Sequence, residues 1–195
     1  MSDLVKIPMF PLALFPLPGE LVPLHIFEPR YKQLLEDVEQ RDISFGIYFN
    51  HATNTEKLGA MVKLESVIKR YPGGESDIIV KCVDLFHMAT LHRTYRDKLY
   101  PGGEVDLWKI KLSDSVTDKL RLEFESFRSL MNLKNYSGDL SFFTIANELN
   151  LDFTDRLRFV LLDTEKKESF LFSRLQYQKQ LLQQVEKAKD VFHLN

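Results

Sequence analysis

The chain of 195 residues has one cysteine, Cys82, so it cannot form an internal disulfide, a usage typical of reducing compartments. It also lacks an excess of charge of either sign, because 26 Lys and Arg against 28 Asp and Glu give a formal net charge of −2. Proteins that bind nucleic acid by neutralising phosphates have a basic excess, so the charge argues against that class. With 44% hydrophobic residues, the composition excludes a disordered chain.

Long apolar runs and common enzyme motifs are missing too. The longest uncharged apolar stretch near the start, residues 9–17, is shorter than a bilayer span of about 20 residues and contains Pro11 and Pro16. We therefore expect a cytoplasmic protein that does not bind membranes. The G-x-x-x-x-G-K-[ST] phosphate loop, the G-x-S-x-G elbow and the H-E-x-x-H helix do not occur. These absences leave little room for an ATPase or protease module, and we expect neither cofactor nor metal; an enzyme that uses another site stays as a further hypothesis.

Proline and glycine are nearly absent from the second half. No proline follows Pro101, and Gly138 is the only glycine after Gly103. Turns therefore belong to the first half, whereas the second half allows uninterrupted helices. We predict a β domain over residues 1–112 and a helical domain over residues 113–195.

The first half has the residue pattern of strands around one helix. Residues 30–40 place apolar side chains on one helical face, with Pro29 at a plausible first position. Gly and Pro turns between strands favour a closed or partly closed antiparallel barrel. β-Branched, aromatic and alternating residues predict strands over 44–50, 58–70, 77–92 and 105–112.

The pentapeptide Tyr-Pro-Gly-Gly-Glu occurs twice, at residues 71–75 and 100–104. It is either a glycine-rich anion nest or a β-turn, with Pro fixing φ at the second position and Gly supplying a positive φ at the third. Neither copy is followed closely by a helix or a basic residue, so we favour the turn.

The second half has the pattern of helices with one apolar stripe each, which predicts a small bundle. Ser115 with Asp118 resembles a capping box at the first of them. The expected helices cover residues 116–130, 141–149, 154–163 and 168–189.

Several reactive side chains are present without a convincing catalytic pattern. Cys82 and His87 are five apart in an expected strand, which puts them on opposite faces about 16 Å apart, so we interpret Cys82 as a buried neutral thiol. His25 is expected to bond to backbone rather than to a metal. The carboxylates Glu36, Asp37, Glu39 and Asp42 are interpreted as a solvated helix surface.

Two charged groups have both a functional and a structural interpretation. Glu28 and Arg30 form either a binding clamp or a partly buried ion pair shielded by Phe27 and Tyr31, and we favour the structural role for this motif. Basic residues of segment 93–98 alternate with aromatic ones, as in a single-strand nucleic-acid platform or an ordinary hairpin loop.

The beginning of the chain resembles a known family. Residues 10–12 (Phe-Pro-Leu), 15–19 (Phe-Pro-Leu-Pro-Gly) and 21–31 (Leu-Val-Pro-Leu-His-Ile-Phe-Glu-Pro-Arg-Tyr) resemble the opening of the amino-terminal, substrate-binding domain of Lon protease. The resemblance departs at Cys82 and Leu85, where that family usually has Gly and Arg. It implies an α+β fold, with a PUA-like β pseudo-barrel followed by a small helical bundle.

The resemblance also implies a function. In full-length Lon this domain precedes an ATPase and a serine–lysine protease, so this chain looks like a stand-alone, non-catalytic relative that binds unfolded or partner protein segments. Tyr95, Tyr100 and Trp108 are the candidate peptide contacts, because aromatic anchors dominate interfaces. The alternative is an RNA-binding module, since PUA-like barrels also recognise RNA. The sequence predicts neither the identity of the partner nor the oligomeric state.

Overall fold

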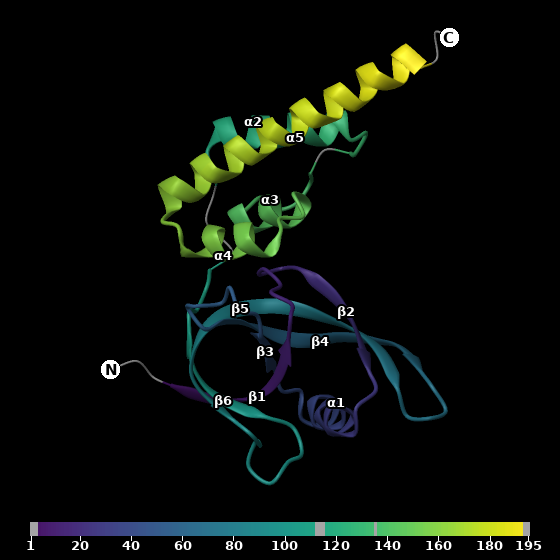
Figure 1. Ribbon diagram of the computed structural model, residues 1–195, viewed down its shortest axis with the longest axis vertical. Helices are drawn as coiled ribbons and strands as arrows, with labels where there is room; N and C mark the ends of the chain where they lie inside the picture. The colour runs from purple at the N-terminus through teal and green to yellow at the C-terminus, as the bar shows by residue number, and fades with distance from the viewer. Residues whose placement is uncertain (1–3, 112–115, 135, 193–195) are drawn as a thin grey trace. The chain divides into compact units, whose positions relative to one another are not determined.

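The structure is a computed structural model that describes residues 4–111, 116–134 and 136–192. It contains two compact units, Met1–Ile110 and Lys111–Asn195, which are described separately. Within the described residues the first unit has six strands and one helix, and the second has four helices (Figure 1). The predicted α+β class, with strands followed by helices, is confirmed.

The strands of the first unit form a barrel with one additional edge strand. The sheet order is β2-β5-β4-β3-β1-β6, and β6 also pairs with β5, which closes the barrel and leaves β2 outside it. Strands β1 and β3 are parallel, whereas the other pairs are antiparallel. The elements are β1 (Val5–Leu12), β2 (Leu21–Ile26), α1 (Pro29–Arg41), β3 (Phe45–Phe49), β4 (Leu58–Arg70), β5 (Ser76–His92) and β6 (Gly102–Leu107).

Two strands were not expected, and one begins earlier than predicted. The proline-rich opening forms β1 and β2, and β6 includes the glycines of the second pentapeptide, which is therefore not a turn. A Cβ on Gly103 would lie 2.6 Å from Met9 Cε, so the strand passes too close to Met9 for a side chain. Here glycine serves close packing rather than turn geometry.

The first pentapeptide does form the turn between β4 and β5. Its Gly74 N–H donates to the Tyr71 carbonyl at 2.9 Å, as in a β-turn. The positive φ of 83° lies at Gly74, the fourth residue, and not at the third residue, Gly73. This is the geometry of a turn followed by a left-handed residue, which adds twist to the hairpin.

One acidic side chain of α1 is buried instead of solvated. Asp37 is 4% exposed, accepts a 2.7 Å hydrogen bond from the Tyr100 hydroxyl, and lies 2.9 Å from Lys98 Nζ. Burial would raise the pKa of Asp37, but these hydrogen bonds outweigh it and hold the pKa below its usual value. The carboxylate therefore joins α1 to the β5–β6 loop, and the interpretation of all four α1-region carboxylates as solvated is wrong for Asp37.

The second unit packs four helices, α2 (Asp118–Leu130), α3 (Phe142–Glu148), α4 (Phe153–Leu161) and α5 (Thr164–Phe192). The N-cap of α2 is Thr117, whose side chain accepts from Leu120 N, whereas the predicted cap Ser115 lies outside the described residues. Ion pairs link the helices: Lys179–Glu123 joins α5 to α2, Arg128–Glu148 joins α2 to α3, and Arg174–Asp155 joins α5 to α4. The buried apolar set includes Leu120, Phe124, Phe127, Ile145, Phe159, Leu171 and Leu175.

Because each unit has its own apolar core, we predict that residues 1–110 fold without the helices. The isolated fragment should unfold in urea in one cooperative transition followed by far-UV circular dichroism. A fragment that is aggregated, or that shows no transition, would contradict this prediction.

Replacing Tyr100 with Phe removes one hydrogen bond to a buried carboxylate and keeps the ring. We expect the free energy of unfolding of the first unit to fall by about 1.5–3 kcal/mol. Tyr95→Phe is the control, because its hydroxyl faces no such carboxylate among the described residues. Urea denaturation of both variants measures the difference, and equal losses would argue against a special role for the Asp37 contact.

Candidate functional site

The sheet formed by β2, the first half of β5 and the second half of β4 has one face turned to solvent. Residues directly opposite one another in an antiparallel pair project from the same face. Leu21 pairs with Lys81, Pro23 with Ile79, and His25 with Asp77. Neither partner of any of these pairs is buried, whereas Val22, Ile26, Ile78 and Val80 on the opposite face are. We call the exposed face, which carries Leu21, Pro23, His25 and their paired residues, the outer face.

An aromatic row lies at one end of the outer face, formed by Phe27, His25 and Tyr71. The Phe27 and His25 rings stack at 5.9 Å and 24°, and the Tyr71 ring meets His25 edge-on at 5.9 Å. Lys69 Nζ lies over the Tyr71 ring at 4.4 Å. This row combines apolar area with a cation and a histidine edge, a combination suited to contacts with side chains of another molecule.

Hydrogen bonds fix the orientation of this row. Both His25 Nδ1 (2.6 Å) and the Tyr71 hydroxyl (2.7 Å) donate to the Asp77 carboxylate. These bonds, from His25 first and Tyr71 second, lower the pKa of Asp77, while the same contact raises the pKa of Tyr71. The expectation that His25 bonds to backbone is therefore wrong: a carboxylate holds it, with the ring at the surface.

The expectation that Phe27 shields a partly buried Glu28–Arg30 ion pair is also wrong. Its side chain is 58% exposed, and the Glu28–Arg30 ion pair beside it, with atoms 2.8 Å apart, is exposed as well. Tyr31 is the buried aromatic residue, 4% exposed, with its ring centroid 3.9 Å from that of Phe10. The motif is thus divided: Tyr31 anchors α1 in the core, whereas Phe27 projects outward at the turn into α1.

The three aromatic residues expected to contact peptides do not form one surface. Tyr100 is 1% exposed and belongs to the core, so it is not available as a contact. Tyr95 stacks on Tyr100 at 5.9 Å, beside the start of β6. Trp108 follows the other end of β6, where its indole N–H donates to His87 Nδ1 at 2.7 Å. A site that joins all three is not formed.

Other candidate chemistry is engaged in structural contacts. The buried Cys82 thiol lies 3.6 Å from the Pro16 carbonyl oxygen and 3.5 Å from that of Asp84, whereas His87 binds Trp108, so thiol and imidazole make separate contacts. In the part of the chain that the structure describes, no cluster of three or more His, Cys, Asp or Glu could hold a metal ion. The described helices include none that is long and apolar enough to span a bilayer.

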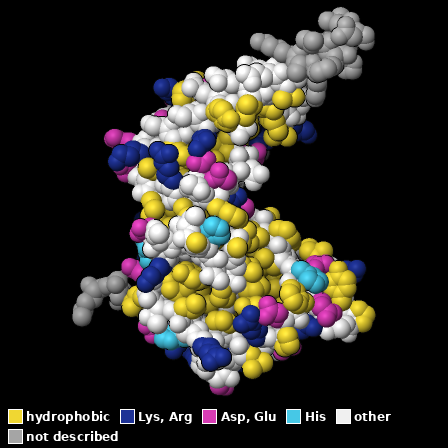
Figure 2. Space-filling model, viewed as in Figure 1, with side chains coloured by type: hydrophobic (Ala, Val, Ile, Leu, Met, Phe, Trp, Pro, Cys, Tyr) yellow, Lys and Arg dark blue, Asp and Glu magenta, His cyan; other side chains and the backbone are white. Residues whose placement is uncertain are grey.

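Two further exposed apolar side chains occur on the strands that form the outer face. Leu21 on β2 and Ile68 on β4 are both more than half exposed, like Phe27. Ile68 has no paired residue in β5, because it lies at an irregularity in the β4–β5 register between Val67 and Lys69. Figure 2 shows that hydrophobic side chains of the β unit are not confined to its interior but gather on the viewed surface.

One feature of the sequence, the alternation over residues 21–26, indicates the outer face and is not among the predictions above. Leu21, Pro23 and His25 alternate with Val22, Leu24 and Ile26, the period of a half-buried strand. Pro16, Pro18 and Pro23 lie in or just before this segment, and proline is more common in loops than in strands. An edge strand tolerates proline, so alternation was the better guide.

Phe27→Ala and Tyr31→Ala form a matched pair four residues apart. We expect Phe27→Ala to change the free energy of unfolding by less than about 1 kcal/mol, because the exposed ring buries little area. Tyr31→Ala should cost about 3 kcal/mol or more, because it leaves a cavity against Phe10. Thermal or urea unfolding distinguishes them, and a large loss in Phe27→Ala would show that the ring is part of the core.

Comparison with known proteins agrees with this architecture. The crystal structure of a Lon N-terminal domain protein from Xanthomonas campestris superposes with a TM-score of 0.64, at 22% identity over 91% of this chain and 97% of that one. The N-terminal domain of a Mycobacterium avium complex Lon protease superposes with a TM-score of 0.62, at 13% identity over 88% and 98% of the two chains. No curated protein matches the chain. The two superpositions show a shared fold.

The family model of the ATP-dependent protease La (LON) substrate-binding domain matches residues 6–191, which include both units. The resemblance seen in the proline-rich opening therefore extends through β5, β6 and the helices, where residue matches are sparse. The chain belongs to the LON substrate-binding domain family.

Proposed function

We propose that this chain is a non-catalytic module that binds extended, apolar segments of other proteins on the outer face. The observation that carries the proposal is the exposure of Phe27, a large aromatic side chain held at the surface beside His25 and Tyr71. The family, described as the substrate-binding domain of a protease, supports a protein ligand. A cytoplasmic location is part of this proposal, supported by a chain whose one cysteine cannot form an internal disulfide.

The dimensions of the surface suit a short extended segment. Strand β2 has six residues and is therefore about 20 Å long, which matches about six residues of an extended peptide. Leu21 lies at its first residue and Phe27 directly after its last, so apolar anchors stand at both ends. Exposed apolar patches of this kind mark interaction sites.

Side-chain contacts, rather than addition of a peptide strand to β2, provide the binding in this proposal. Although β2 is an edge strand, Pro23 lies at its centre and has no N–H to donate. Proline on an edge is a device that prevents strand addition. The proposed ligand therefore packs its apolar side chains on the face of the sheet, and its affinity is modest because the unfolded partner loses chain entropy.

The segment that suggested the RNA alternative keeps only part of its pattern at the surface. Lys98 is paired with the buried Asp37 and Tyr100 is in the core, so the aromatic ring left in the segment is that of Tyr95, with the Arg96 guanidinium 5.3 Å from its centroid. Stacking of bases would require exposed aromatic rings next to free cations.

The proposal is tested by titrating a fluorescently labelled, carboxymethylated and therefore permanently unfolded protein into the chain and measuring anisotropy. We expect Phe27→Ala to weaken binding about tenfold, the loss typical of an aromatic anchor. Leu99→Ala is the matched control, because Leu99 is equally exposed but lies on the β5–β6 loop. If the parent chain does not bind, or if both variants bind as it does, the outer face is not the site.

A further inference from the structure

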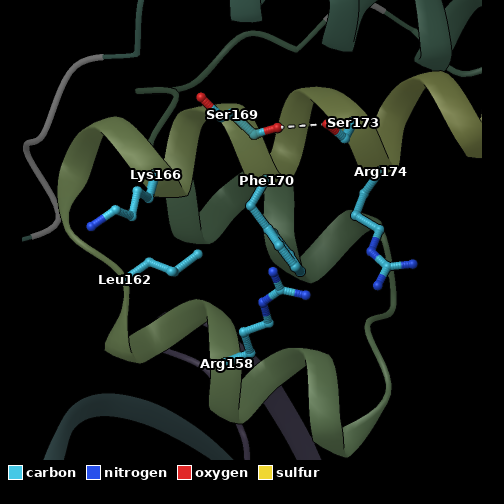
Figure 3. A pocket seen from close by; sticks show the side chains of 7 residues that line it. All are labelled: Arg158, Leu162, Lys166, Ser169, Phe170, Ser173 and Arg174. Atoms are coloured by element: carbon cyan, nitrogen blue, oxygen red, sulfur yellow. Dashed lines mark hydrogen bonds between the residues drawn. The ribbon is translucent and has the colours of Figure 1, made fainter.

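A pocket of about 410 Å³ lies in the helical unit, between the last turn of α4 and the first turns of α5. Its lining consists of three cationic side chains, two serines, Phe170 and Leu162. In Figure 3, Arg158 from α4 reaches up to the Phe170 ring and Arg174 stands beside it on α5, while Lys166 points away. The pocket is independent of the outer face, since both helices belong to the second unit.

The aromatic ring keeps the two guanidinium groups in place. The Arg158 and Arg174 guanidinium carbons lie 5.9 Å and 5.4 Å from the Phe170 ring centroid. Phe170 is half-buried and packs at 5.9 Å against the ring of Phe159, which is fully buried. Arginine stacked on a fixed ring loses little freedom when it binds a ligand, so the pocket is preorganised.

The cations differ in whether they already have a partner. Arg174 is paired with Asp155 and Lys166 with Asp163, each at 2.6 Å. Arg158 is exposed, and the described residues provide no carboxylate that pairs with it. Its guanidinium donors therefore remain available, and a planar guanidinium matches a carboxylate or phosphate with two parallel hydrogen bonds.

The two serine hydroxyls do not provide hydrogen-bond donors for a ligand. Ser169 Oγ donates to the Glu165 carbonyl at 3.1 Å, and Ser173 Oγ donates to the Ser169 carbonyl at 2.9 Å, as Figure 3 shows for the second bond. With both hydroxyl hydrogens in use, Arg158 is the donor group of the pocket lining that is left for a ligand. Phe170 and Leu162 add apolar contact area beside them.

We propose that this pocket binds a peptide carboxylate that neighbours an apolar side chain, with Arg158 holding the carboxylate and Phe170 and Leu162 contacting the apolar group. The carboxylate comes either from Asp or Glu or from a chain terminus, which share this chemistry. A single carboxylate fits better than a nucleic-acid backbone, because Asp155 and Asp163 already neutralise two of the three cations and repel a chain of phosphates.

The test is fluorescence anisotropy with the full chain and a fluorescein-labelled decapeptide of alternating Glu and Leu, with free or amidated C-terminus. Arg158→Gln should weaken its binding about tenfold, the cost of losing one charge-assisted contact. Lys119→Gln is the matched control: Lys119 also lies over a phenylalanine ring of α5, that of Phe172 at 4.5 Å, but outside this pocket. It should change affinity less than about twofold.

Further arms identify the ligand group. A peptide with Gln in place of Glu and an amidated terminus should lose binding, and comparison of free and amidated Glu peptides shows which carboxylate is used. Circular dichroism checks that Arg158→Gln remains folded, as expected for an exposed side chain. Equal losses in Arg158→Gln and Lys119→Gln, retained binding of the Gln peptide, or an Arg158-dependent preference for single-stranded RNA would each overturn the proposal. All arms are measured in the Phe27→Ala background as well, where the outer face is impaired; an Arg158-dependent loss that persists there separates this pocket from the outer face.

Discussion

The 17 residues of β5 pair with three other strands, and the exposed surface of the β unit results from how those pairings are divided. From Ser76 to Lys81 the strand pairs with β2, and from Phe86 to His92 it pairs with β6, while β4 pairs with it on the other side from Ser76 to His87. Only the second half belongs to the closed barrel. The first half projects beyond the barrel with β2 and β4, so its outer face is not enclosed by other strands.

Position alone would not hold Phe27 in a defined place, because it lies in the turn between β2 and α1. The residue before it, Ile26, is buried at the end of β2, and Tyr31 is buried in the first turns of α1. The helix is in turn fixed to the β5–β6 loop by Asp37, Lys98 and Tyr100. Both flanks are therefore anchored in the core, and an exposed ring with anchored flanks loses little entropy on binding, which is the property expected of an interface anchor.

The sequence was a good guide where periodicity and burial coincide. The long strands β4 and β5, the helix α1 and three of the four bundle helices lie close to their predicted ranges, since their apolar patterns are long and regular. The predictions that failed, for β2 and for the start of β6, have a common physical cause: the same residue type occurs in two kinds of structure. Proline marks loops but is tolerated in edge strand β2, and glycine marks turns but fills the tight contact of Gly103 with Met9.

The same reasoning explains why the candidate sites were missed. Asp37 has a carboxylate side chain but is buried, because Lys98 and Tyr100, some sixty residues away in sequence, supply its hydrogen-bond partners. Phe27 has an apolar side chain but is exposed. No single-sequence pattern reports a partner that distant. Residue type alone therefore assigned Asp37 to solvent, Phe27 to the shield of a partly buried ion pair and Tyr100 to an interface, and the burial of these side chains contradicts each assignment.

A second arginine of the helical unit, Arg128, can be compared with Arg158. Arg128 likewise lies near aromatic rings, 5.6 Å from that of Phe124 and 5.7 Å from that of Tyr136. Yet each of its three guanidinium nitrogens donates a hydrogen bond: one to Glu148 at 2.6 Å and two to the Lys134 carbonyl. Arg128 thus has protein acceptors for its guanidinium, as expected of an arginine that stabilises the fold, since a guanidinium without protein acceptors adds little stability. Arg158 has the ring but no carboxylate within the described chain, and the fold leaves it at the mouth of a pocket, where the missing acceptor is best supplied by a ligand.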